Sequence, residues 1–115
     1  MEMVLIKDTK KIGFEMSPKR VRVMFRGQII ADSNKVRLLL PGGPPYYYFP
    51  KEDVRMEMLQ PTERVEDVDT LGRASFWNVK VGDRTAENAA WTYTQPVSEN
   101  IDLSRLMGFK VVEEA

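Results

Sequence analysis

Short runs of alternating residues constrain the fold of this 115-residue chain more than any other feature. Val21, Val23 and Phe25 alternate with Arg22 and Met24, and this spacing of two predicts a β-strand. Turn residues separate this run from several similar ones. Parallel strands would need crossover connections of about a dozen residues or more, and the chain has no room for several crossover helices. The pattern therefore predicts an all-β, mainly antiparallel fold, built as a compact sandwich or a barrel-like pair of sheets.

The expected strands follow one another along most of the chain. They cover residues 21–25, 28–31, 36–40, 46–49, 54–58, 74–81, 89–93 and 109–112. Two-residue turns are expected at 26–27 and 82–83, because each contains a glycine, which accepts a positive φ. The polar, acidic stretch 62–70 is expected to be the longest loop.

The two ends of the chain differ from the strand-rich middle. Residues 1–16 are expected to be a lead-in segment, and residues 17–113 a single β domain. One short C-terminal helix is expected to run to Met107, with Ser98 or Asn100 as its cap.

The chain contains no cysteine and no histidine. Disulfides, thiolate nucleophiles, cysteine zinc sites and histidine-based triads therefore cannot form within it. No cofactor or metal site is expected, and any metal would have to be a hard cation held by oxygen ligands. The apolar run near the N-terminus is too short for a signal peptide and no stretch is long enough for a membrane helix, so the expected location is the cytoplasm.

Charge is balanced over the whole chain but not along it. Lys and Arg number 17, as do Asp and Glu, so the net charge is zero. Residues 1–37 hold nine basic and four acidic groups, whereas residues 50–70 hold three basic and seven acidic groups. Such asymmetry can guide self-association or attract a small charged ligand. Nucleic acid is not expected as a partner, because a neutral domain lacks the general excess of cations that draws it.

Three segments carry a resemblance to a known family. They are VRVMFRGQIIADS (21–33), YYYFPKEDVRMEML (46–59) and GRASFWNVKVGDRTAENAAWTY (72–93). They resemble a family that is catalogued as a domain of unknown function and also carries a nucleotidyltransferase-type name. The similarity covers roughly residues 17–112. The resemblance implies a compact, mainly antiparallel β fold, and it implies no established activity.

The chain departs from that family in one segment, directly before residue 73. Members of the family that this sequence resembles typically show a Cys-Pro-Tyr-Lys-Gly run there. In this chain, residues 68–72 read Val-Asp-Thr-Leu-Gly. A function that needs the cysteine or the lysine is therefore in doubt. The family name still suggests an alternative, a divergent metal-dependent nucleotidyltransferase-like enzyme that uses carboxylates. Asp67 and Asp69 would lie on the same side of an extended segment, but a lone pair of this kind in an acidic loop is most simply a solvated surface.

Aromatic residues give the main candidates for a binding face. Alternation places Tyr46 and Tyr48 on one face of their strand and Tyr47 on the other. Tyr48 with Tyr93 is therefore predicted to line a cleft, since a tyrosine offers both an apolar ring and a polar hydroxyl to a ligand. The alternative is that the aromatic side chains simply form the core.

Two tryptophans and three charged residues complete the candidate ligand-binding set. They are Trp77, Trp91, Asp53, Arg55 and Arg84. Arginine binds anions through a bidentate fork, although Asp53 could also cap a turn and Arg84 could pair with a nearby glutamate. We expect a non-enzymatic small-ligand-binding or protein-interaction module, with no catalytic residues and a small anionic or aromatic ligand. Homodimer formation through exposed apolar strand edges is a further expectation.

Overall fold

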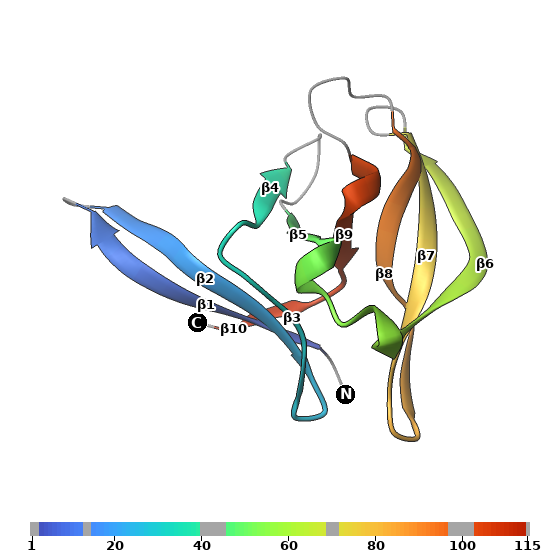
Figure 1. The fold of residues 1–115 in the computed structure, drawn as a ribbon, viewed down its shortest axis with the longest axis horizontal. Helices are drawn as coiled ribbons and strands as arrows, with labels where there is room; N and C mark the ends of the chain where they lie inside the picture. Colours follow the sequence, from blue (N-terminus) through green and yellow to red (C-terminus); the bar gives the residue numbers. More distant parts are fainter. Residues whose placement is uncertain (1–2, 13–14, 40–45, 69–71, 97–102, 115) are drawn as a thin grey trace.

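A computed structural model describes residues 3–12, 15–39, 46–68, 72–96 and 103–114. These residues form two β-sheets (Figure 1). The first sheet has four strands in the order β10-β1-β2-β3. Its strands are β1 (Val4–Ile12), β2 (Glu15–Phe25), β3 (Gln28–Ser33) and β10 (Val112–Glu114). Strand β10 pairs in parallel with β1, and the other neighbours in this sheet are antiparallel.

The second sheet has six strands in the order β4-β5-β9-β8-β7-β6. Its strands are β4 (Arg37–Leu39), β5 (Tyr46–Pro50), β6 (Leu59–Val68), β7 (Gly72–Val81), β8 (Arg84–Pro96) and β9 (Leu106–Phe109). All of its neighbouring strands are antiparallel. The prediction of an all-β, mainly antiparallel pair of sheets is confirmed.

Two tight hairpins form where the sequence predicts them. Between β2 and β3, Arg26 has φ 53° and Gly27 has φ 78°, and two successive positive φ values are what a type I′ hairpin turn requires. Between β7 and β8, Gly82 has φ 60°. The right-handed twist of these turns matches that of the strands they join, which fixes the register of both hairpins.

The sequence-based prediction is wrong for the segment between β5 and β7. Residues 54–58 were expected to form a strand, but they hold only a single bridge, between Val54 and Ala31, and one 3₁₀ turn, η2 (Met56–Met58). Another 3₁₀ turn, η1 (Lys51–Asp53), directly precedes them. The strand β6 instead occupies most of the expected loop. It lies at the edge of its sheet and most of its side chains are exposed, so charged residues replace the alternating pattern that identifies a half-buried strand.

The predicted C-terminal helix is also wrong within the described residues. Only a 3₁₀ turn, η3 (Leu103–Arg105), precedes β9, and residues 98–102 lie outside the part of the chain that the structure describes. All four residues of β9 are buried, because this strand lies between β5 and β8 with packing on both faces. A continuous apolar run of this kind cannot be distinguished from a buried helix by its periodicity.

The N-terminal segment is part of the sheet. Strand β1 lies within residues 1–16, the expected lead-in, and it pairs with both β2 and β10. The side chain of Leu5, in β1, is 2% exposed. The alternation of Val4, Leu5 and Ile6 is therefore that of a strand with one face on the core.

Two apolar clusters hold the fold together. The larger contains side chains from both sheets, including Leu5 and Val23 from the first and Phe49 and Phe109 from the second. The smaller cluster comes only from the six-stranded sheet and η3, and consists of Tyr48, Ala74, Trp91, Tyr93, Leu103 and Leu106. Since neighbouring residues of β5 and β9 divide between the two clusters, the six-stranded sheet packs on both of its faces.

Candidate functional site

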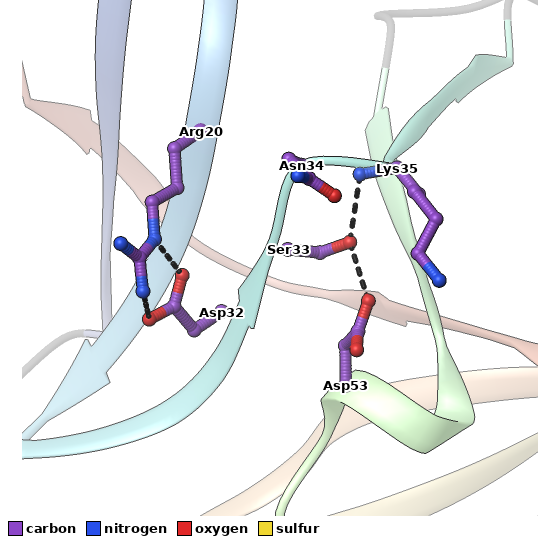
Figure 2. A pocket seen from close by; sticks show the side chains of 6 residues that line it. All are labelled: Arg20, Asp32, Ser33, Asn34, Lys35 and Asp53. Atoms are coloured by element: carbon purple, nitrogen blue, oxygen red, sulfur yellow. Dashed lines mark hydrogen bonds and ion pairs between the residues drawn. The ribbon is translucent and has the colours of Figure 1, made fainter.

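A polar pocket of about 370 Å³ lies where β3 approaches η1 (Figure 2). It is lined by Arg20 from β2, Asp32 and Ser33 from β3, Asn34 and Lys35 from the following turn, and Asp53 from η1. Two backbone contacts bring these segments together. Ala31 forms a β-bridge with Val54, and the Arg55 N–H donates to the Ile30 carbonyl at 2.8 Å. The pocket therefore lies at the junction between the two sheets, and we call it the junction pocket.

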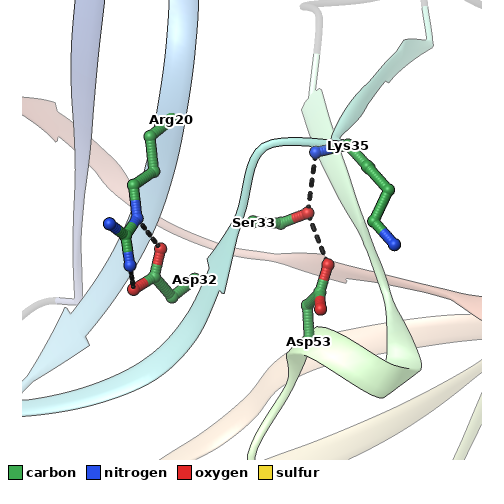
Figure 3. Close-up of polar contacts among 5 residues, drawn as sticks. All are labelled: Arg20, Asp32, Ser33, Lys35 and Asp53. Carbon is green, nitrogen blue, oxygen red and sulfur yellow. Dashed lines mark hydrogen bonds and ion pairs between the residues drawn. The ribbon is translucent and has the colours of Figure 1, made fainter.

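Ser33 connects the two sides of the junction pocket. Its side chain is only 4% exposed. The Ser33 hydroxyl donates to Asp53 Oδ2 at 2.7 Å and accepts the Lys35 backbone N–H at 2.9 Å (Figure 3). The second contact is a serine turn, in which the side-chain hydroxyl accepts the N–H of the residue two positions later, as a backbone carbonyl does in a β-turn. One buried hydroxyl thus fixes both the backbone at Lys35 and the orientation of the Asp53 carboxylate.

An ion pair forms another wall of the pocket. Arg20 donates from Nε to Asp32 Oδ1 and from Nη2 to Asp32 Oδ2, both at 2.6 Å. The hydrogen bond from Arg20 lowers the pKa of Asp32 below its ordinary value, against an opposing effect of partial burial. A bidentate pair of this geometry neutralises both charges. The Arg20 side chain is 54% exposed and that of Asp32 is 25% exposed, so solvent screens the attraction and the pair contributes only about 1 kcal/mol to stability.

Lys35 is the second cation in the pocket. Its Nζ lies 3.3 Å from Glu52 Oε1, and both side chains are mostly exposed, at 63% and 69%. An exposed lysine pair of this length is weak and readily exchanged. Lys35 therefore keeps an ammonium group that a ligand can approach.

The predicted aromatic candidates meet elsewhere, on the outer face of the six-stranded sheet. Tyr48, Trp91 and Tyr93 are all at least nine-tenths buried. Trp91 Nε1 donates to the Tyr48 hydroxyl at 3.1 Å, and the hydroxyls of Tyr48 and Tyr93 lie 3.4 Å apart. Burial, assisted by the contact with Tyr48, raises the pKa of Tyr93. The structure thus brings these three residues together as a packed cluster that satisfies its own polar groups.

A glycine makes this aromatic packing possible. Gly108 of β9 lies opposite Tyr48 on one side and Trp91 on the other. A Cβ atom at Gly108 would lie 2.7 Å from Trp91 Cε2 and 2.8 Å from Tyr48 Cε1. Both rings therefore occupy the space that any other residue would need.

The remaining predicted site residues lie apart from the junction pocket. The side chains of Arg55 and Arg84 are exposed, and Arg84 begins β8 directly after the β7–β8 turn. Trp77 packs partly buried against the larger cluster, and its buried Nε1 has no hydrogen-bond partner in the described part of the chain. Of the seven predicted ligand-binding residues, only Asp53 lines the pocket.

Sequence reasoning missed most of the residues that surround Asp53. None of the residues 32–35 is among the predicted site residues, although four of the six residues that line the pocket come from this segment. The available signal was two polar turn segments, at 32–35 and 50–53, each of which contains charges of both signs. Nothing local in the sequence shows that these two turns meet.

The predicted carboxylate pair has a different environment. Asp67 accepts a hydrogen bond from Arg73 Nε at 2.9 Å, and Asp69 lies outside the described residues. Among the side chains that the structure describes, no three of the Asp, Glu, His and Cys types gather closely enough to hold a metal ion. No helix in the described segments has the length and apolar character needed to cross a bilayer.

Comparison with known proteins identifies a family but no activity. A family model described as a domain of unknown function (DUF427), with a nucleotidyltransferase-type name, matches residues 13–114. A search of curated proteins returns no match. The description of the family names no substrate or partner, so these must be inferred from the geometry of the chain.

Proposed function

Because this chain belongs to the DUF427 family of domains of unknown function, with residues 13–114 matched, we propose a function from its own geometry: it is a non-catalytic module that binds a small polar molecule in the junction pocket. The observation that carries the proposal is the state of the Asp53 carboxylate. Ser33 holds Oδ2 of Asp53 at 2.7 Å, while no hydrogen bond from the described residues reaches Oδ1. One oxygen is therefore held by the protein, and the proposal assigns the other to the ligand.

The surroundings of Asp53 favour binding over a purely structural role. A carboxylate that is oriented before a ligand arrives loses little freedom on binding, and such preorganisation raises affinity. The pocket volume of about 370 Å³ falls at the small end of the range seen for ligand sites, about 300–1,000 Å³. Its lining consists of charged and hydrogen-bonding residues, which favours a hydrophilic ligand.

The same geometry favours binding without turnover. Ser33 is 4% exposed, and its oxygen already accepts the Lys35 N–H. A serine nucleophile needs an exposed oxygen and an adjacent base, whereas this hydroxyl is enclosed and used for structure. The nucleotidyltransferase-type reading has no comparable support, since the described residues offer no group of carboxylates for a metal.

A thermal-shift screen tests this proposal. Its panel contains amino acids, small acids, small amines, sugar phosphates and nucleotides, applied to the wild-type chain and to Asp53→Ala. A ligand at a hundredfold excess over Kd stabilises the folded state by about 2.7 kcal/mol, which for a chain of this size raises Tm by about 10 °C. We expect at least one compound to raise the Tm of the wild type and to lose most of that effect in Asp53→Ala.

Glu87→Ala is the matched control, because Glu87 is an exposed carboxylate that does not line the pocket. It should respond to the same compound as the wild type does. The proposal fails if no compound in the panel raises Tm. It fails equally if the active compounds stabilise Asp53→Ala as much as the wild type.

A further inference from the structure

The charged side chains of the junction pocket carry both signs. Arg20 and Lys35 supply two cations, and Asp32 and Asp53 supply two anions. Arg20 and Asp32 neutralise each other through two hydrogen bonds at 2.6 Å. The charges left for a ligand are therefore the carboxylate of Asp53 and the ammonium of Lys35, both from groups that line the same hollow (Figure 2).

The two remaining groups differ in how firmly they are held. Asp53 is fixed by the buried Ser33 hydroxyl, whereas within the described residues the ammonium of Lys35 makes an exposed contact with Glu52 at 3.3 Å. A cationic group of a ligand thus meets a rigid acceptor, and an anionic group meets a mobile ammonium that can follow it. Asn34, the residue before Lys35, also lines the pocket and is exposed. Its amide offers both a donor and an acceptor.

We propose that the ligand of the junction pocket is a small zwitterion of the amino acid class, with its ammonium group on Asp53 Oδ1 and its carboxylate on Lys35 Nζ. This inference rests on the function proposed above and specifies the ligand. A simple anion would meet Lys35 but also the negative charge of Asp53. A simple cation would meet Asp53 but also the positive charge of Lys35. Only a molecule with both charges gains both contacts without a repulsive one.

The test is a titration of the ¹⁵N-labelled chain followed by NMR. The zwitterionic probes are α-amino acids and the ω-amino acid series from glycine to 6-aminohexanoate, which varies the distance between the two charges. The singly charged probes are propylamine and propanoate. We expect at least one zwitterion to bind about tenfold more tightly than either singly charged probe, a ratio that corresponds to about 1.4 kcal/mol.

Two conservative variants separate recognition from folding. Asp53→Asn retains an oxygen that can accept the Ser33 hydrogen bond, and Lys35→Met retains the backbone N–H that Ser33 binds. Both should therefore keep the fold, as checked by their NMR spectra. Asp53→Asn should bind the zwitterion no more tightly than propanoate, because the ammonium has lost its partner. Lys35→Met should bind it no more tightly than propylamine, because the carboxylate has lost its partner.

Three results would overturn the inference in distinguishable ways. If propylamine or propanoate binds as tightly as every zwitterion and depends on Asp53, the pocket binds ligands but the ligand class is wrong. If no zwitterion binds although another compound of the thermal-shift panel does so through Asp53, the class is again wrong and the proposed function stands. If no compound binds in either experiment, both proposals fail.

Discussion

Replacing Gly108 with alanine should disrupt the outer aromatic cluster of the six-stranded sheet. The new Cβ would lie 2.7 Å from Trp91 Cε2, 2.8 Å from Trp91 Nε1 and 2.8 Å from Tyr48 Cε1. Neither ring can simply turn away. The Trp91 indole donates to the Tyr48 hydroxyl and also contacts the ring of Tyr46 at a centroid distance of 5.2 Å and that of Phe76 at 6.2 Å.

The expected cost follows from overpacking. Forcing one extra methyl group into a well-packed site destabilises a protein by about 1–3 kcal/mol. An alanine in a strand otherwise gains about 0.5–1 kcal/mol over glycine, because glycine loses more freedom on folding. The clash with two ring systems exceeds this gain, so we expect Gly108→Ala to unfold more easily by about 1–2 kcal/mol.

Chemical denaturation measures this change directly, and thermal unfolding gives a second estimate. Unfolding entropy near 60 °C is about 2.1 cal/mol/K per residue, so each kcal/mol lowers the Tm of a chain of this size by about 4 °C. Gly108→Ala should therefore melt about 4–8 °C below the wild type. The denaturant m-value should remain unchanged, because the surface exposed on unfolding is the same.

A double-mutant cycle identifies the clash as the cause. Trp91→Leu removes the whole ring system, including Cε2 and Nε1, the two indole atoms nearest to the new Cβ. In that background Gly108→Ala should cost at least about 0.5 kcal/mol less than in the wild type, which is the coupling expected of residues in contact. The reasoning is refuted if Gly108→Ala is as stable as the wild type, or if its cost is the same with leucine at position 91.

Two further predictions concern single residues of the six-stranded sheet. Asn88 has φ 50°, and both Asn88→Gly and Asn88→Ala lose the hydrogen bond that Thr62 donates to it. Because only glycine adopts a positive φ without strain, Asn88→Ala should be less stable than Asn88→Gly by about 1 kcal/mol in urea unfolding. Equal stabilities of the two variants would contradict this. Burial raises the pKa of the Tyr93 phenol above its ordinary value of 10.0, so folding favours the neutral phenol. Tyr93 therefore stabilises the folded state fully below about pH 10, and this contribution is lost as the pH rises further. Urea midpoints between about pH 8 and pH 11 should therefore fall less steeply in Tyr93→Phe than in the wild type or in Tyr46→Phe, whose ring is 40% exposed; identical slopes in all three would show that Tyr93 does not cause the decline.

Features that depend on local chemistry could be predicted from the sequence. The β2–β3 turn needs positive φ at two adjacent residues, and Gly27 supplies one of them at no cost. Alternation also divided the tyrosines of β5 correctly. Tyr47 packs against the inter-sheet cluster, whereas Tyr48 belongs to the cluster on the opposite face. Such assignments need only the backbone geometry of one strand.

Features that depend on neighbouring strands could not be predicted in the same way. Strand β6 reads as a polar loop because its side chains are mostly exposed, and only its pairing with β7 makes it a strand. Strand β9 reads as the end of a helix because both of its faces are buried. In each case the tertiary environment, and not the local pattern, determines the secondary structure.

The junction pocket was hidden for the same reason. Asp53 could be selected as a polar residue in a turn, but its partner Ser33 is 20 residues away in the chain. Their contact depends on the bridge between Ala31 and Val54, which joins β3 to a segment that the sequence predicted as a regular strand. Residues whose role comes from such a long-range contact carry no local signal.

Mapping the binding site by NMR tests the central claim most directly. The compound that gives the largest thermal shift is titrated into the ¹⁵N-labelled chain, and the backbone amides that move are identified. We expect the largest changes at Ser33, Asn34, Lys35 and Asp53, which line the junction pocket. Changes centred instead on the outer face around Tyr46 and Phe76, with the pocket amides unmoved, would contradict the assignment of this pocket as the binding site.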